Sequence, residues 1–233
     1  MYANVIRAGL LAAGLVGFGL SDVRAQSAGS FSGNMAIVSD YIVRGTSLSN
    51  QNPAIQGGFD WDSGMGVYAG LWGSSVEFGN DASAEFDFLA GYRGRFDNLH
   101  YEVGATYYWY PKTSVAGQSF WDVHADVGYD LGISDLTLGV AYTLDDYGPL
   151  RNDATLYYEA GIILPVAEMM TVSGGIGYSV AERRTNYSDW NAGVTFRVLN
   201  LFNFDVRYFD SDNDLICGAL CNARAVVKIS RTF

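Results

Sequence analysis

The chain has 233 residues, of which 49% are hydrophobic and 15% aromatic, with 28 glycines and only 4 prolines. One closed all-β domain commonly reaches this length, so a division into several domains is not needed. The formal net charge of −11 argues against nucleic acid as a partner, because binding to backbone phosphates requires a basic face.

The first 25 residues have the organisation of a secretory signal peptide. The apolar run from Ala8 to Leu20 is shorter than the roughly 20 residues that a membrane-spanning helix needs. It leads into Val23-Arg24-Ala25, a small-residue cleavage pattern, so we predict cleavage before Gln26. The alternative is an N-terminal membrane anchor or a buried helix.

Apolar and polar residues alternate along most of the remaining chain. In the segment from Phe120 to Asp130, FWDVHADVGYD, an extended strand would have one apolar and one acidic face. The pattern recurs every 10 to 15 residues or so, with aromatic residues near the ends, which is typical of a transmembrane β-barrel. We therefore predict a short periplasmic lead over residues 26–33 and an all-β barrel, antiparallel and up-and-down, over residues 34–233.

Twelve strands are predicted, with ten or fourteen as alternatives if a run has been split or merged. In chain order they are 34–44, 53–61, 65–78, 83–96, 99–110, 119–130, 136–144, 153–164, 170–180, 188–198, 202–211 and 222–233. Every second connection is short, as expected of periplasmic turns. These short connections lie around Ser63, Asn98, Ser134, Val166 and Asn200. Most of the others are longer and would lie outside, the exception being Gly79 to Ala82.

The predicted outward faces carry no charged side chain on the clearest strands, as contact with lipid requires. A soluble lipocalin-like barrel would reverse the two faces. Aromatic residues near the strand ends form two predicted girdles, one outer and one inner. The outer girdle comprises Trp109, Trp121, Tyr142 and Trp190, and the inner one comprises Tyr92, Tyr101, Tyr129 and Phe204.

The last strand presents Ala225, Val227, Ile229, Arg231 and Phe233 on one face. A terminal aromatic residue at the end of such a face looks like the signal by which outer-membrane barrels are recognised for assembly. Arg231 departs from that pattern, but an arginine near the interface can extend its charged group toward the lipid head groups.

Several segments resemble a known family. They are SDYIVRG at 39–45, SLSN at 47–50, PAIQGGFD at 53–60, YAGLWGS at 68–74, AGY at 90–92, and Asp189-Trp190 with the terminal Phe233. Together they resemble the TorF-type porin family of Gram-negative bacteria, over essentially the whole mature chain but most specifically in residues 39–92. Val43 stands where an aromatic residue is expected. The resemblance implies an outer-membrane barrel involved in transport, without a substrate or catalytic residues to carry over.

The predicted inward face carries ten acidic and seven basic side chains. They are Asp40, Arg44, Glu85, Asp87, Arg93, Arg95, Glu102, Asp122, Asp126, Asp130, Glu159, Asp189, Arg197, Asp205, Arg207, Arg224 and Lys228. With His124, the constriction candidates are Asp87, Arg93, Glu102, Asp122, Asp126, Glu159, Arg197, Asp205 and Arg207. Such a lumen suits a water-filled constriction that selects ions. The alternative is a closed lumen laced by ion pairs, because twelve strands lie between barrels that side chains fill and those with an open channel.

The residue patterns do not indicate an enzyme, a metal site or a cofactor. His100 and His124 face inward on neighbouring strands, but they are offset in register and have no adjacent Ser. The acidic run beginning at Asp210 resembles a calcium loop, yet Leu215 and Cys221 occupy its Gly and Glu positions. We expect solvated histidines and a solvated loop, with loose bridging of cations to lipopolysaccharide as an alternative.

Cys217 and Cys221 are the only cysteines, and both lie in the last outer loop. A local disulfide is the default for an exported pair. Its very short ring should shape the loop more than it stabilises the barrel.

Two functional hypotheses follow. The first is a passive outer-membrane channel of a Gram-negative bacterium, with small solutes or ions passing through the charged lumen. The second is a closed barrel that acts as a surface binding or structural protein through its loops, especially 45–52, 111–118 and 210–221. In both, the partners include membrane lipid, lipopolysaccharide and the barrel assembly machinery.

Overall fold

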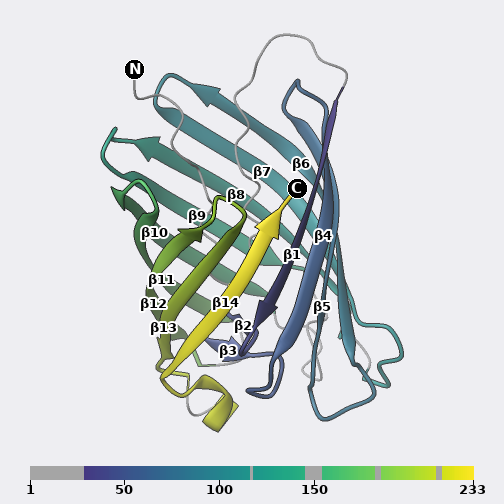
Figure 1. The fold of residues 1–233 in the computed structure, drawn as a ribbon. Coiled ribbons are helices and arrows are strands. Elements are labelled where there is room, and N and C mark those ends of the chain that lie inside the picture. Colours follow the sequence, from purple (N-terminus) through teal and green to yellow (C-terminus); the bar gives the residue numbers. More distant parts are fainter. Residues whose placement is uncertain (1–28, 116–117, 145–153, 182–184, 214–216) are drawn as a thin grey trace.

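The computed structural model describes residues 29–115, 118–144, 154–181, 185–213 and 217–233, so the predicted signal peptide lies outside the described residues. Twelve antiparallel strands close into one barrel in the order β1-β14-β13-β12-β11-β10-β9-β8-β7-β6-β5-β4, which confirms the predicted fold (Figure 1). The strands are β1 (Ser30–Val38), β4 (Ala54–Asp62), β5 (Val67–Ser75), β6 (Ala84–Phe96), β7 (Leu99–Trp109), β8 (Phe120–Asp130), β9 (Asp135–Thr143), β10 (Thr155–Ala167), β11 (Met170–Ala181), β12 (Tyr187–Val198), β13 (Phe202–Ser211) and β14 (Arg224–Thr232).

The two ends of the barrel differ because short and long connections alternate. Connections of two to four residues join β4 to β5, β6 to β7, β8 to β9, β10 to β11 and β12 to β13 at one end, the short-turn end. The longer connections gather at the opposite, long-loop end. Both chain termini of the barrel lie at the short-turn end, where Gly33 and Phe233 exchange two backbone hydrogen bonds of 2.8 and 2.9 Å.

Four predicted strand boundaries are wrong by three residues or more. The first strand begins at Ser30, inside the predicted periplasmic lead of residues 26–33, and the strand predicted over 65–78 ends at Ser75. The first strand, predicted over 34–44, ends at Val38, because the side chain of Asp40 accepts hydrogen bonds from its own loop and the chain leaves the wall. The strand predicted to end at Leu164 continues to Ala167. Its pairing with β11 shifts register between Pro165 and Ala167, which is where a sheet tolerates a proline.

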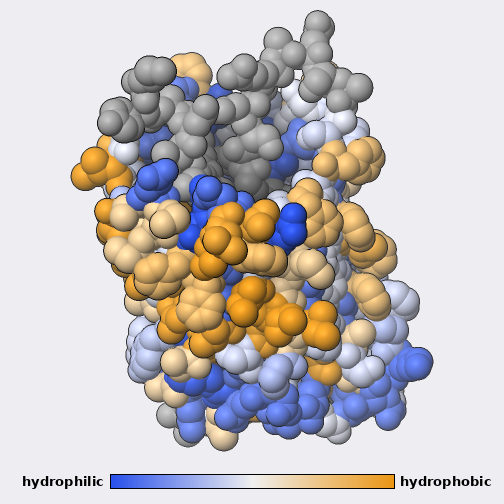
Figure 2. Space-filling model, in the orientation of Figure 1, coloured by the Kyte–Doolittle hydropathy of each residue, from blue (hydrophilic) through white to orange (hydrophobic). Residues whose placement is uncertain are grey.

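The outer surface of the barrel is apolar. Exposed large hydrophobic side chains occur on all twelve strands, from Phe31 on β1 to Ile229 on β14. On the face drawn in Figure 2 they form a band across the middle of the molecule, with hydrophilic residues below it. Among the described residues, no helix is long and apolar enough to cross a membrane.

The predicted girdle residues point outward. Trp109, Trp121, Tyr142 and Trp190 lie near the long-loop ends of their strands and Tyr129 near a short-turn end, each between 37% and 47% exposed. Neighbouring strands pair these rings with other aromatic ones. The ring of Trp121 lies 5.0 Å from that of Tyr107, centroid to centroid, and the ring of Trp109 lies 5.7 Å from that of Phe86.

Candidate functional site in the barrel lumen

The connection between β1 and β4 does not extend away from the barrel but folds into its long-loop end. It contains a small hairpin made of β2 (Ile42–Val43) and β3 (Thr46–Ser47). Arg44 and Gly45 form its two-residue turn, with φ values of 46° and 77°. Positive φ at both central residues is what a type I′ hairpin turn requires. We call residues 39–53 the inner loop.

Asp40 holds the inner loop together and ties it to the wall. Its carboxylate accepts hydrogen bonds from Ser47 Oγ at 2.6 Å and Ser49 Oγ at 3.0 Å. The other carboxylate oxygen accepts a 2.8 Å bond from Arg224 Nη1 on β14. A buried carboxylate is stable only when its oxygens accept hydrogen bonds, as both oxygens of Asp40 do. Asp40, which is predicted to lie on a strand, therefore organises a loop.

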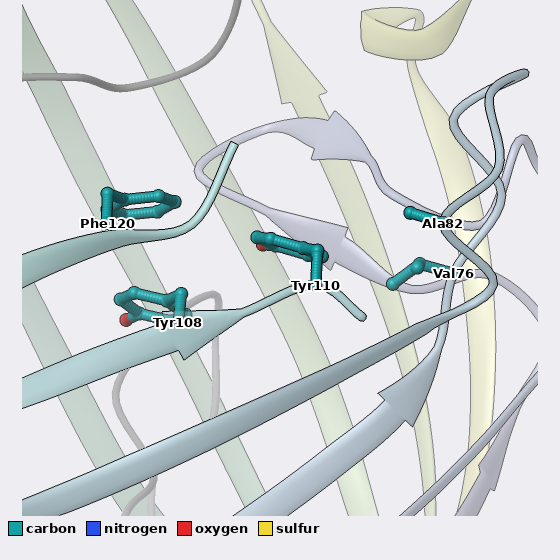
Figure 3. Close-up of a cluster of buried hydrophobic side chains, with 5 residues drawn as sticks. All are labelled: Val76, Ala82, Tyr108, Tyr110 and Phe120. Atoms are coloured by element: carbon teal, nitrogen blue, oxygen red, sulfur yellow. The ribbon is translucent and has the colours of Figure 1, made fainter. Parts of the chain in front are cut away.

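A second anchor connects the inner loop to β6. The hydroxyl of Tyr41 donates a 2.6 Å hydrogen bond to Glu85 Oε1, and Tyr110 donates to the other oxygen of the same carboxylate. Burial, and then the charge of Glu85, raise the pKa of Tyr41 well above its ordinary value, so the hydroxyl remains a donor. Tyr41 and Leu48 also pack on a buried apolar cluster, drawn in Figure 3, that comprises Val76, Ala82, Tyr108, Tyr110 and Phe120.

Arg44, at the turn of the hairpin, reaches across the lumen to the far wall. Its Nη2 donates a 2.9 Å hydrogen bond to Asp122 Oδ2 on β8, and its guanidinium carbon lies 4.5 Å from the ring centroid of Tyr157 on β10. Burial alone lowers the pKa of Arg44, but Asp122 together with three nearby tyrosines more than offsets this, so its pKa lies above the ordinary value. The guanidinium is therefore a fixed positive charge inside the barrel.

Gly45 allows the hairpin to touch the wall at β12 and β13. A Cβ atom at this position would lie 2.8 Å from Asp189 Cβ and 2.7 Å from Ser211 Cβ, closer than real side chains approach. Together with the positive φ, this contact excludes other residues.

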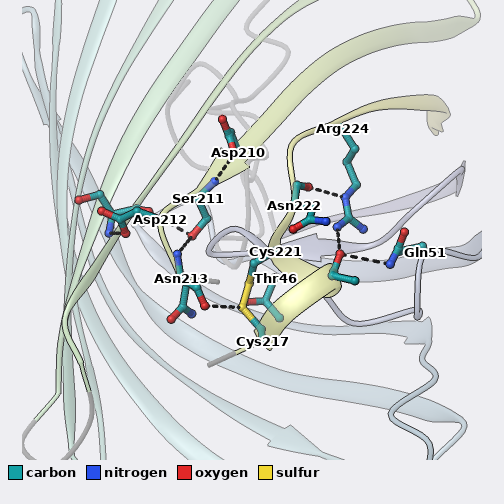
Figure 4. Close-up of a disulfide and its surroundings, with 12 residues drawn as sticks. Thr46, Gln51, Asp210, Ser211, Asp212, Asn213, Cys217, Cys221, Asn222 and Arg224 are labelled. Carbon is teal, nitrogen blue, oxygen red and sulfur yellow. Dashed lines mark hydrogen bonds between the residues drawn. A yellow bond between two sulfur atoms is a disulfide. The ribbon is translucent and has the colours of Figure 1, made fainter. Parts of the chain in front are cut away.

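A disulfide supports the hairpin from the loop after β13, as Figure 4 shows. Cys217 and Cys221 are joined at the ends of a short 3-10 helix, η1 (Gly218–Cys221). Since a bonded sulfur carries no proton, the hydroxyl of Thr46 donates to Cys221 Sγ, at 3.2 Å. Gln51 Nε2 donates a 3.2 Å bond to the carbonyl of Ala219.

Four of the lumen carboxylates lie in one row of directly paired residues. Across successive strands the register runs Arg93, Glu102, Asp126, Gly139, Glu159, Gly177, Asp189 and Ser211. Glu102 lies three residues from the short-turn end of β7, whereas Asp189 lies two residues from the long-loop end of β12. The strands of a barrel tilt, so this row climbs along the wall from one end to the other. We call it the acidic row.

Glycines make room for the acidic row. Side chains at Gly139 would collide with Asp126 and Glu159, and side chains at Gly177 would collide with Tyr157 and Asp189. No ion pair with Arg or Lys involves Asp126 or Glu159 within the described ranges. Asp189 accepts hydrogen bonds from the hydroxyl of Tyr157, at 3.0 and 3.2 Å.

Two of the predicted basic candidates, Arg93 and Arg207, pair with side chains that lie outside the acidic row. Arg93 Nη2 lies 2.5 Å from Asp62 Oδ2, next to the short-turn end. Arg207 donates to Asn191, Ser173 and Asp205, and its Nη2 lies 3.2 Å from Asp205 Oδ2. Arg197 faces the lumen near the short-turn end of β12, where it pairs in register with Asn203.

The prediction underestimated the acidity of the lumen. Asp60, Asp62 and Asp135 also face inward, because Asp60 lies against Gly70, Asp62 pairs with Arg93 and Asp135 bonds to His100. Asp62 and Asp135 lie just outside the predicted strands 53–61 and 136–144, which explains why these two were missed, whereas Asp60 lies within the first of these strands.

The histidines do not share a site. His100 Nε2 lies 3.0 Å from Asp135, and His124 Nε2 lies 3.4 Å from Glu102. His124 pairs in register with Gly104, four residues from His100, so the predicted offset is confirmed. No group of three His, Cys, Asp or Glu side chains among the described residues could hold a metal ion.

Only part of this arrangement had a signal in the sequence. Arg44-Gly45 between Val43 and Thr46 fits a two-residue hairpin turn, because Gly is favoured at the second turn position and β-branched residues flank the turn. Nothing in the sequence says that this hairpin enters the barrel, and Tyr157 as a partner of Arg44 lies 113 residues away.

A family model described as a bacterial protein of unknown function, Gcw_chp, matches residues 22–233. The chain belongs to the Gcw_chp family. No curated protein sequence matches this Gcw_chp chain significantly.

Solved structures with the same fold are porins and channels. The KdgM porin has a TM-score of 0.62 and 9% identity, over 87% of this Gcw_chp chain and 99% of KdgM. The NanC porin has a TM-score of 0.59 and 9% identity, over 88% and 99%. The COG4313 outer membrane channel from Pseudomonas putida F1 has a TM-score of 0.53 and 12% identity, over 91% and 98%. At these identities the likeness shows the fold alone.

Proposed function

We propose that the chain is a channel of the Gram-negative outer membrane, through which small solutes or ions diffuse passively, and not an enzyme. The observation that carries the proposal is the acidic row, an ordered track of carboxylates along the lumen from near the short-turn end to near the long-loop end. Three further observations support the proposal: the apolar band on the outer surface, the porin-like fold and the resemblance to the TorF-type family.

The same proposal places membrane lipid against the apolar belt, with lipopolysaccharide at the long-loop end. Phe233 would serve as the recognition signal for the barrel assembly machinery. The predicted signal peptide would direct the chain to this route.

The lumen chemistry favours cations over anions. The solved KdgM porin was obtained in complex with disordered oligogalacturonate, a chain rich in carboxylates. Because the lumen of this protein carries more acids than bases, it would repel a polyanion. We therefore do not propose oligogalacturonate as a ligand of this chain.

The inner loop supports a second candidate, the closed barrel that acts through its loops. Glu85, Asp87 and Asp122 face the lumen at the long-loop end but are only 1%, 3% and 3% exposed. Packing of the inner loop against these carboxylates narrows the lumen at the long-loop end. The channel requires an open path past the inner loop, whereas the closed barrel does not.

Planar bilayer recordings of refolded residues 26–233 separate the two. Steady conductance steps support the channel, and silence from a barrel with heat-modifiable gel mobility supports the closed candidate. In a second protein, residues 42–47 become Gly-Ser-Gly-Ser-Gly-Ser, which removes the hairpin contacts. We expect at least about a twofold larger conductance, because a barrel of this size is limited by what fills it. The matched control replaces the exposed loop residues 79–81 with Gly-Ser-Gly and should conduct like the wild type.

A further inference from the structure

We propose that the lumen contains a binding site for a guanidinium group of an organic cation, and that Arg44 is a built-in occupant of this site. This inference rests on the proposed channel function and specifies its substrate class. The site comprises Asp122 on β8, Tyr157 on β10 and the end of the acidic row at Asp189.

The surroundings of Arg44 are those that select a guanidinium. A carboxylate binds its N–H groups, and the aromatic face of Tyr157 lies beneath the planar group at 4.5 Å. Arg44 also interacts electrostatically with Glu159 and Asp189 of the acidic row. An arginine from a loop thus fills a site that three strands of the wall form.

Arg44 fills this site incompletely. It donates to Asp122 through Nη2 alone, whereas Arg44 Nε and Asp122 Oδ1 are buried without a hydrogen-bond partner among the described residues. The Asp122 side chain is only 4% exposed, so the wall and the hairpin shield this unused oxygen from solvent. A carboxylate and a guanidinium normally form two parallel bonds. A free guanidinium, unlike one tethered to the hairpin, can turn to make both.

The hairpin does not need arginine at this position. A type I′ turn prefers Asn or Gly at its first central residue, and an arginine at φ 46° is unfavourable there. Asp40 and Tyr41 anchor the inner loop without help from Arg44. An unfavourable backbone conformation that packing does not require indicates a role for the side chain.

The acidic row provides the route to the site. A cation entering at the short-turn end meets Glu102 and Asp126 first, then Glu159, and finally Asp189, which interacts electrostatically with the Arg44 guanidinium. Within the described ranges no group of three His, Cys, Asp or Glu side chains could hold a metal ion. An organic cation with a guanidinium group would displace Arg44 and with it the turn of the hairpin.

The test uses Arg44→Asn, because asparagine adopts the required backbone conformation but carries no charge. Calorimetric titration of the detergent-solubilised protein with methylguanidinium should show binding at least about tenfold tighter in Arg44→Asn than in the wild type, since the tethered competitor is gone. Arg231→Gln removes the same charge from the outer surface, where Arg231 lies over Phe202, and should behave as the wild type. Adding Asp122→Asn to Arg44→Asn should abolish the gain.

Equal affinity in Arg44→Asn and Arg231→Gln would overturn the proposal, as would equally tight binding of tetramethylammonium, which has no N–H group. In bilayers, methylguanidinium should block Arg44→Asn at about tenfold lower concentration than the wild type. Binding without conductance in any variant would refute the channel and leave the site intact. Conductance without guanidinium binding would refute the site alone.

Discussion

The two halves of the lumen differ in what surrounds their charges. At the long-loop end the inner loop packs against Glu85, Asp87 and Asp122, each 3% exposed or less. At the short-turn end the side chains of Glu102 and Asp135 are 22% and 23% exposed. The carboxylate of Glu85, which accepts hydrogen bonds from Tyr41 and Tyr110, therefore acts mainly as a structural partner, whereas the carboxylates of Glu102 and Asp135 are more accessible to solvent and can act on a passing solute.

The largest expected effect comes from releasing the inner loop. Asp40→Ala leaves Arg224 without its carboxylate and removes the acceptor of Ser47 and Ser49. Loss of one partner of a buried ion pair costs about 3 to 5 kcal/mol. We expect the inner loop to detach and the single-channel conductance to rise toward that of the hairpin-replacement protein.

Asp210→Ala is the control for this change, because Asp210 lies at the same end but, among the described residues, bonds only to Tyr208 and Ser211 at the surface. Conductance of Asp40→Ala equal to that of Asp210→Ala would show that the inner loop does not restrict the lumen.

A smaller effect is expected from neutralising the acidic row. Asp126→Asn with Glu159→Gln should lower the cation-to-anion permeability ratio about threefold, because this removes from the path two carboxylates that form no ion pair with a described Arg or Lys. The reversal potential in a tenfold salt gradient measures this ratio. Asp97→Asn, in an exposed turn, provides the control.

Glu85, in the packed half of the lumen, can be tested with the same measurement. Glu85→Gln, in the packed half, should leave the permeability ratio unchanged but lower the temperature of unfolding, since Tyr41 and Tyr110 lose a charged acceptor. A change in the permeability ratio as large as that of the double variant would contradict the assignment of Glu85 to a structural role.

The smallest effect is expected at the disulfide. Replacing Cys217 and Cys221 by serine should lower the free energy of unfolding by about 2 kcal/mol or less, because the bridge closes a ring of only a few residues. Conductance should stay at the wild-type value, and reduction of the wild type should give the same result. A rise in conductance as large as that expected for Asp40→Ala would instead identify η1 as an essential support of the hairpin.

The sequence was sufficient for the wall of the barrel. Strict alternation decides which side chains face lipid, because successive residues of a strand point to opposite sides, so Trp121 and Asp122 could be assigned without a structure. The recurrence of this alternation predicted twelve strands, and the lengths of the connections predicted which end of the barrel carries the short turns.

The contents of the lumen were decided only by tertiary structure. Asp40 and Arg44 continue the alternation of the first strand, and nothing local marks the point where the chain leaves the wall. That point depends on Arg224, Asp122 and Tyr157, which lie 184, 78 and 113 residues away from their partners in the inner loop. Strand pairing is encoded by a repeating local pattern, whereas a loop packed inside a barrel is stabilised by single contacts between distant residues, which no periodicity reveals.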